Sequence, residues 1–189
     1  MRRSTLLAAV LLTLTAVPAL AQNFSEGFTF LKAVRERDGA EAQELVDAGN
    51  PAVLNYRDQS SGEGALHILV RDREIEWLRF LLARGLRPDI QTRDGTTPLS
   101  MAAQIGWLPG AEELLNRRAN PNIGNSLGET PLIFAVRRHD VAMVRLLLSK
   151  RADPNQTDHS AGYSALDYAR QDRRAAAVLR ELEQAAARR

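Results

Sequence analysis

The sequence predicts an all-α solenoid of about five stacked helix-turn-helix units with projecting finger loops, preceded by a signal peptide. A Thr-Pro-Leu motif recurs, and the leucines that end two copies, Leu99 and Leu132, lie 33 residues apart. A loop that contains proline follows a leucine-rich stretch at the same period. Self-similarity at a fixed period of this kind is typical of repeat proteins, in which each unit buries its apolar face against its neighbours.

The first 21 residues have the three parts of a secretory signal peptide. Arg2 and Arg3 form a positive start, an uncharged and mostly apolar run follows, and Ala19-Leu20-Ala21 is a small-x-small cleavage signal. An uncleaved membrane anchor is the alternative, because the apolar run is near the lower limit for spanning a bilayer. We expect cleavage after Ala21, which leaves residues 22–189 as the mature chain with no further membrane segment.

Composition favours an exported bacterial protein, periplasmic or secreted. Arginine outnumbers lysine 23 to 2 and alanine is abundant, as in proteins from GC-rich genomes. The chain has no cysteine, so disulfides, cysteine-ligated metals and a cysteine nucleophile are excluded and stability must come from packing. Because Arg2 and Arg3 account for the whole formal charge of +2, residues 22–189 carry no net charge. A general electrostatic attraction to nucleic acid therefore has no support.

An atypical unit over residues 24–59 is expected to begin the array. Residues 30–34 suit its first helix, and Leu45-Val46 suit its second. The spacing to the next unit is longer than the regular period by about three residues, which we assign to the loop around Tyr56–Ser61.

Three regular units should follow, over residues 60–92, 93–125 and 126–158. In each, a glycine-containing turn precedes a first helix. In the second and third of these units, Thr97 and Thr130 can cap that helix, with proline at its first position. Small residues on the first helix let neighbouring helices approach, and leucines on the second fill the space between layers. The last unit, residues 159–187, lacks a further Pro-Asn loop and is predicted to be a C-terminal cap.

The segments 94–122 and 128–155 resemble the ankyrin repeat, whose hallmark is T-P-L-H-x-A at this period. The segment 62–89 keeps the leucine and histidine of that motif, Leu66 and His67, but lacks Thr-Pro. The resemblance extends over about residues 24–187. It implies an L-shaped stack whose fingers and first helices form a concave, protein-binding face without a catalytic site.

The resemblance also implies which residues would contact a partner: finger residues and the two first-helix residues after the small pair. Arginine and tyrosine are favoured anchors of interfaces, and Ile105 and Leu127 are apolar where framework packing does not demand it. An ordinary solvent-facing role is the alternative for every one of them. The predicted protein-binding residues are Arg93, Gln104, Ile105, Leu127, Glu129, Arg137, Arg138 and Tyr163.

The remaining polar residues do not suggest an enzyme. His67, His139 and His159 lie in different units without metal-ligand spacing, and the resemblance gives His67 a loop-bracing role. No nucleotide-binding or hydrolase motif is present. We predict no catalytic activity, cofactor or metal. The basic C-terminal unit is interpreted as a polar outer face rather than a nucleic-acid patch, and Trp77 and Trp107 as packing residues, with an exposed contact the alternative for Trp107.

The predicted function is therefore a non-enzymatic protein-protein interaction module, an adaptor or scaffold. The alternative is an inhibitor or immunity-type protein that blocks or protects one exported enzyme. Both would use the concave face, so the motifs do not separate them. Because the end units look like caps, we expect a monomer.

Overall fold

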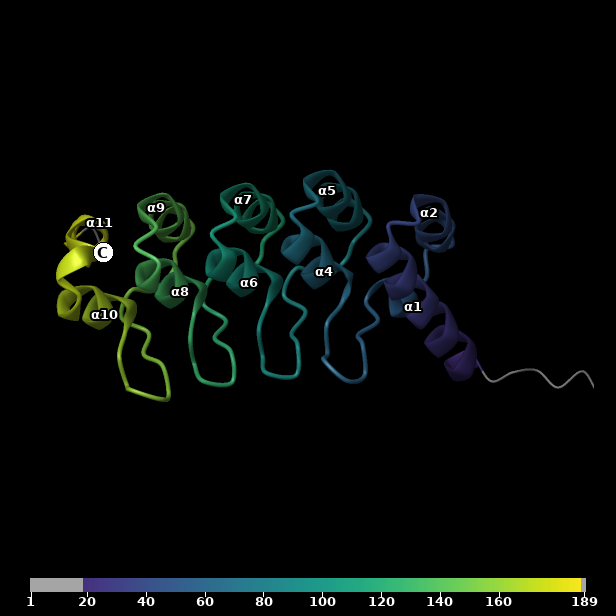
Figure 1. Ribbon diagram of the computed structural model, residues 1–189, viewed down its shortest axis with the longest axis horizontal. Helices are drawn as coiled ribbons and strands as arrows, with labels where there is room; N and C mark the ends of the chain where they lie inside the picture. The colour runs from purple at the N-terminus through teal and green to yellow at the C-terminus, as the bar shows by residue number, and fades with distance from the viewer. Residues whose placement is uncertain (1–18, 188–189) are drawn as a thin grey trace, which may run out of the picture.

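The computed structural model describes residues 19–187, which form a stack of helix pairs (Figure 1). Residues 1–18 of the predicted signal peptide lie outside the described residues. The helices are α1 (Ala19–Glu36), α2 (Gly39–Asp47), α3 (Pro51–Leu54), α4 (Ala65–Asp72), α5 (Ile75–Ala83), α6 (Pro98–Ile105), α7 (Leu108–Asn116), α8 (Pro131–Arg137), α9 (Val141–Ser149), α10 (Ala165–Gln171) and α11 (Ala176–Ala187), with a short 3₁₀ helix, η1 (Arg173–Ala175), before α11.

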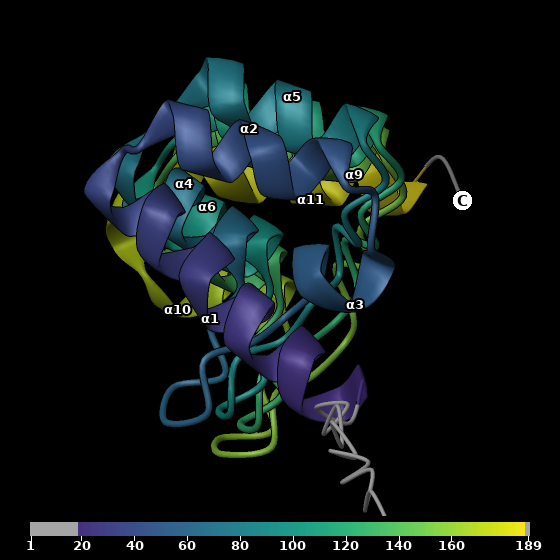
Figure 2. The same ribbon diagram turned by 90° about the vertical axis from the view of Figure 1, so that its right-hand side faces the viewer.

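The helices form two layers. First helices α1, α4, α6, α8 and α10 make the inner layer, and α2, α5, α7, α9 and α11 make the outer layer (Figure 1). Viewed from the α1 end, the fingers gather on one side of both layers (Figure 2). The predicted all-α repeat array is thus confirmed for the described residues.

Local sequence sets the helix starts as predicted. The Thr97 side chain accepts a hydrogen bond from the Ser100 amide at 3.1 Å, and Pro98 occupies the first helical position of α6. Thr130 accepts one from the Ile133 amide at the start of α8. These bonds satisfy amides that have no partner within the helix.

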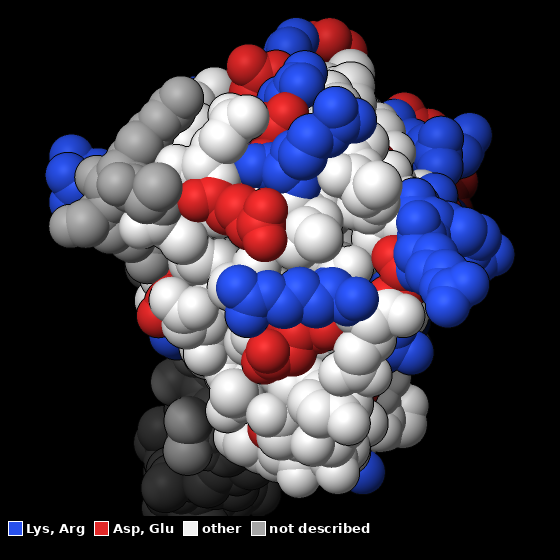
Figure 3. All heavy atoms as spheres, turned by 90° about the vertical axis from the view of Figure 1, so that its left-hand side faces the viewer, with Lys and Arg blue, Asp and Glu red and all other residues white. Residues whose placement is uncertain are grey.

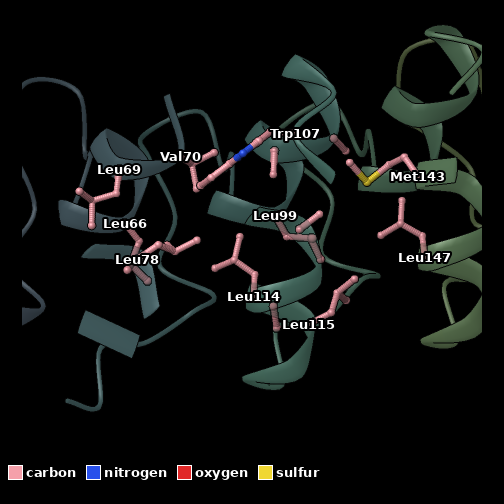
Figure 4. Close-up of a cluster of buried hydrophobic side chains, with 14 of the residues drawn as sticks. Leu66, Leu69, Val70, Leu78, Leu99, Trp107, Leu114, Leu115, Met143 and Leu147 are labelled. Atoms are coloured by element: carbon pink, nitrogen blue, oxygen red, sulfur yellow. The ribbon is translucent and has the colours of Figure 1, made fainter. Parts of the chain in front are cut away.

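The core lies between successive pairs. Leu99 and Leu114 of unit three and Leu147 of unit four are fully buried (Figure 4). Leu132, in the inner layer of unit four, is also fully buried. Ala102 is also fully buried, and its small side chain lets adjacent first helices approach. Deleting a core leucine of this kind typically costs about 2–5 kcal/mol.

Trp107 belongs to this core, which confirms its packing role. Only 7% of its surface is exposed. Its ring lies against the backbone of Gly110, where a Cβ would sit 2.0 Å from the Trp107 ring. Glycine is thus required in the first turn of α7 because the indole occupies the space that a side chain would need.

The fingers are joined to one another through their backbones. The Arg93 amide donates to the Ser61 carbonyl at 2.9 Å, and the Ser126 amide donates to that of Asp94 at 2.7 Å. The His159 amide donates to the Leu127 carbonyl at 2.7 Å. The fingers therefore form one continuous row along the stack.

His67 braces the first finger against the second, as the resemblance implied. Its Nδ1 accepts from the Gly64 amide at 3.2 Å, so Nε2 carries the proton and donates to the Thr96 carbonyl at 3.0 Å. Burial lowers the pKa of His67 below its ordinary value, which favours the neutral imidazole that this arrangement needs.

The N-terminal unit departs from the expectation in two respects. Residues 48–64 connect α2 to α4, three more than the residues 84–97 that connect α5 to α6. We assigned the extra length to the loop around Tyr56–Ser61, but α3, which precedes that loop, takes up part of it because Asn50 and Pro51 start a helical turn there. In addition, α1 begins at Ala19, so the expected cleavage position falls within its first turn.

We predict that Gly95→Ala destabilises the protein more than Gly162→Ala does. Both glycines have positive φ, +79° and +70°, so alanine costs about 1–2 kcal/mol at either. A Cβ at Gly95 would also lie 2.9 Å from the Ser126 amide nitrogen, whereas nothing lies within 4 Å of one at Gly162. This close contact should also break the hydrogen bond from the Ser126 amide to the Asp94 carbonyl. Gly95→Ala should therefore lower the free energy of unfolding by about 1 kcal/mol more than Gly162→Ala does. Urea unfolding measures both, and equal losses would contradict the role of Gly95 in finger contact.

Candidate protein-binding surface

Four of the predicted binding residues occupy two repeating positions on the finger side of the inner layer. One precedes the N-cap of each first helix, where Glu129 and Tyr163 lie. The other is near the end of that helix, where Gln104 and Arg137 lie. The side chains of Arg93, Gln104, Leu127, Arg137, Arg138 and Tyr163 are exposed, whereas those of Ile105 and Glu129 are partly buried.

Ile105 has a structural explanation that the sequence analysis missed. The repeat pattern predicts no packing demand at Ile105, but its side chain packs against the core. Its carbonyl also accepts a hydrogen bond from Arg73 Nη2 at 3.1 Å, which links units two and three. Its apolar character is therefore required by the fold, whatever it contributes to binding.

Glu129 and Arg137 are brought together as an ion pair. Arg137 Nη1 lies 2.5 Å from Glu129 Oε1, and the guanidinium lies over the Tyr168 ring, 5.8 Å from its centroid. Glu63 and Arg71 form the equivalent pair two units earlier in the stack. These arginines are half-exposed, but their charge is already balanced within the surface. Arg137 is thus held in place rather than free to find a carboxylate.

Tyr168 is the neighbour that sequence reasoning did not identify. Its ring meets Tyr163 edge to face with centroids 5.6 Å apart. Its hydroxyl donates to Asp158 Oδ2 at 2.5 Å, and this bond raises the pKa of Tyr168 to about 12. A repeat alignment could have found it, because α8 carries Phe134 and α6 carries Met101 four residues after their N-caps, as α10 does Tyr168.

Asp158 closes the last finger. It is only 3% exposed, and its Oδ1 accepts the amides of Ser160, Ala161 and Gly162. Burial raises its pKa, but the Tyr168 hydroxyl and these amides outweigh burial and hold the pKa of Asp158 below its ordinary value. The hydrogen bonds that Asp158 accepts therefore hold the finger that carries Tyr163 in one conformation.

Two large apolar side chains stand out from this surface. Leu127, at the tip of the third finger, is 50% exposed, and Tyr163 on the fourth is 39% exposed. The end of the molecule that carries α10 and α11 shows charges of both signs above and a mostly uncharged region below (Figure 3). The exposed residues of the last finger, 160–163, are uncharged.

Arg93 and Arg138 lie apart from this cluster. Arg93 Nη2 donates to the Gln59 carbonyl in the preceding finger. The Arg138 guanidinium lies against Gly106, where a Cβ would be 2.7 Å from its Nη2. The predicted patch therefore separates into a compact part, with Leu127, Glu129, Arg137 and Tyr163, and more distant arginines.

The part of the chain that the structure describes contains neither a side-chain cluster that suits a metal ion nor a membrane-spanning helix. No group of three or more His, Asp or Glu side chains there could hold a metal ion. His139 instead contacts Asp172, with Nε2 and Oδ2 2.7 Å apart. Among residues 19–187, no helix is both long and apolar enough to cross a membrane.

Helix pairs stacked through a shared core, with loops aligned in a row, define a helical solenoid repeat protein. A family model for ankyrin repeats in three copies matches residues 66–158 and again residues 101–183. Together the matches span more than half of the chain, which belongs to the ankyrin repeat family. Ankyrin repeats are typically non-enzymatic modules that bind other proteins.

We predict that Tyr168→Phe destabilises the protein by about 1.5–3 kcal/mol at pH 7, because it removes a hydrogen bond to a buried carboxylate. The lowered pKa of Asp158 adds stability above its unfolded value, near 3.8, and that stability is lost as the pH falls below it. Urea unfolding at pH 7 and pH 3 should therefore show a smaller acid loss in Tyr168→Phe than in the unmodified chain. An unchanged pH dependence would exclude this coupling.

Proposed function

We propose that this protein is an exported, non-enzymatic binding module that holds another protein against its last two fingers and the adjoining first helices. The observation that carries the proposal is the exposure of Leu127 and Tyr163 on fingers that are fixed in position. Because the finger backbones are held by hydrogen bonds, a partner that covers these side chains has little backbone to order, so they are effective anchors.

The surrounding polar groups suit a rim around these anchors. The Glu129–Arg137 pair is about half exposed on its arginine side, and such pairs contribute more to orientation than to affinity. Gln104 is exposed on the neighbouring first helix. An apolar centre with a polar rim is the usual organisation of a protein interface. We further propose that the module is a monomer and binds neither nucleic acid nor membrane.

We predict that Leu127→Ala with Tyr163→Ala weakens partner binding at least about tenfold, or 1.4 kcal/mol. The matched control is Phe28→Ala, because Phe28 is 53% exposed but lies on α1 at the other end of the stack. The partner is first captured on immobilised unmodified protein from a periplasmic extract, and affinities are then measured with the purified partner. Equal affinities for the double variant and the unmodified protein would refute the proposed site.

The same experiment bears on the biological role. A single tight partner with an enzymatic activity that falls on binding would identify an inhibitor, the alternative role. Several partners of moderate affinity would fit an adaptor or scaffold.

Export is proposed from the N-terminal sequence pattern, and α1 is compatible with it. The Asn50 side chain donates a hydrogen bond to that of Asn23 at 2.8 Å, which joins α1 to the loop before α3. Both residues lie after the proposed cleavage position. Gly27, further along α1, packs against Tyr56. A chain that starts at Gln22 therefore keeps both contacts.

We predict that the protein recovered from the producing cell has the mass of residues 22–189 and is found in the periplasm or medium. Ala21→Asp should block processing, because the cleavage signal requires a small uncharged residue there. Mass spectrometry of each fraction measures the outcome. Intact chain confined to the cytoplasm would rule out export.

A further inference from the structure

The outer layer is interrupted between α2 and α5. Further along the stack, α5 packs against α7, α7 against α9 and α9 against α11, whereas α2 packs mainly on α1. Figure 1 shows the wider separation between α2 and α5. The inner layer stays continuous here, because α1 contacts α4. The first unit is therefore attached to the rest of the stack mostly through one layer.

Side chains bridge this seam without filling it. Trp77 and Phe80 project from α5 and meet edge to face, with ring centroids 5.4 Å apart. Hollows of about 70 Å³ and 250 Å³ lie beside Trp77, and an open one of about 420 Å³ lies between α2, α3 and the end of α5. These hollows are partly open to solvent, so the side chains that line them make fewer contacts with the facing unit than a filled interface would give.

Two exposed ion pairs cross the seam. Arg37 Nη2 lies 3.1 Å from Glu74 Oε1, and Arg84 Nη1 lies 2.6 Å from Asp47 Oδ1. Each arginine side chain is more than 40% exposed. Such pairs contribute little to stability and are screened by salt.

The opposite end of the stack is joined more closely. There α11 packs directly on α9, and Val178 and Leu182 of α11 are at most 1% exposed. Arg145 of α9 also pairs with Glu181 at 2.6 Å. A general loss of order at chain ends would affect both ends, whereas this difference in packing singles out the first unit.

We propose that α1, α2 and α3 form a separate cooperative unit that opens at the α2–α5 seam while α4 to α11 remain folded. In a solenoid each unit is stabilised only by its neighbours, so a poorly packed seam divides the array into parts of different stability. Opening exposes Trp77 and the face of α4 that contains Leu69, and it leaves the proposed binding fingers intact.

Hydrogen exchange on the unmodified full-length chain tests the proposal directly. Amides of α1 and α2 should exchange at least about tenfold faster than those of α6 and α8, and also faster than those of α11. Raising the salt concentration should widen the difference, because the seam ion pairs are screened. Equal protection of α2 and α11 would overturn the proposal.

The two tryptophans give an independent test, since Trp77 lies at the seam and Trp107 in the core of unit three. In Trp107→Phe, urea should change Trp77 fluorescence before the helical circular dichroism signal. In Trp77→Phe, Trp107 fluorescence should change at the same urea concentration as the helical circular dichroism signal. In the Trp107→Phe background, adding Arg37→Gln and Asp47→Asn should lower the urea concentration at the midpoint of the Trp77 fluorescence change. The control substitution Arg145→Gln should leave that midpoint unchanged. Coincident transitions in every variant would show that the chain unfolds as one unit.

Discussion

Burial of each unit's apolar face against its neighbour is the interaction on which the rest of this structure depends. Leu66, Leu99 and Leu132 recur one repeat apart, and each is at most 1% exposed. No disulfide is available to compensate for a weak contact, because the chain has no cysteine. Local signals such as the Thr97 cap set where a helix starts, but a single short helix pair would not be stable in water. Each unit is therefore stabilised by its interfaces with the units on either side of it.

The finger row follows from this stacking. Once the helix pairs are in register, equivalent loops lie beside one another, and the same amide-to-carbonyl bond can form between successive fingers. Glycine with positive φ is needed where the next finger approaches, as at Gly95 and Gly128. Loops that would be mobile in isolation thus become a fixed edge, and side chains on that edge, including Leu127 and Tyr163, are presented in a constant arrangement.

Packing along the stack is unequal, and the closely packed part is the part that carries the proposed binding surface. The surface proposed for partner binding belongs to the third to fifth units, where α9 and α11 pack closely and Tyr168 fixes the last finger through Asp158. The loosest interface lies at the other end, between α2 and α5. Motion of the first unit would therefore leave the proposed contact residues in place. This arrangement fits a module whose recognition surface needs to be rigid while one end of the stack does not.

The sequence by itself determined the repeat period, the all-α class, the helix caps and the packing role of Trp107, and its resemblance to the ankyrin repeat implied the bracing role of His67. The features read from the residues themselves depend on residue type and on spacing along the chain, where local sterics and hydrogen bonding dominate. Only the tertiary structure decided that Glu129 balances Arg137, that Ile105 packs against the core, that Tyr168 supports Tyr163, and that α3 takes up part of the first loop. These features depend on which side chains meet between elements, and that follows from the packing angle and distance of whole units, which residue spacing does not specify.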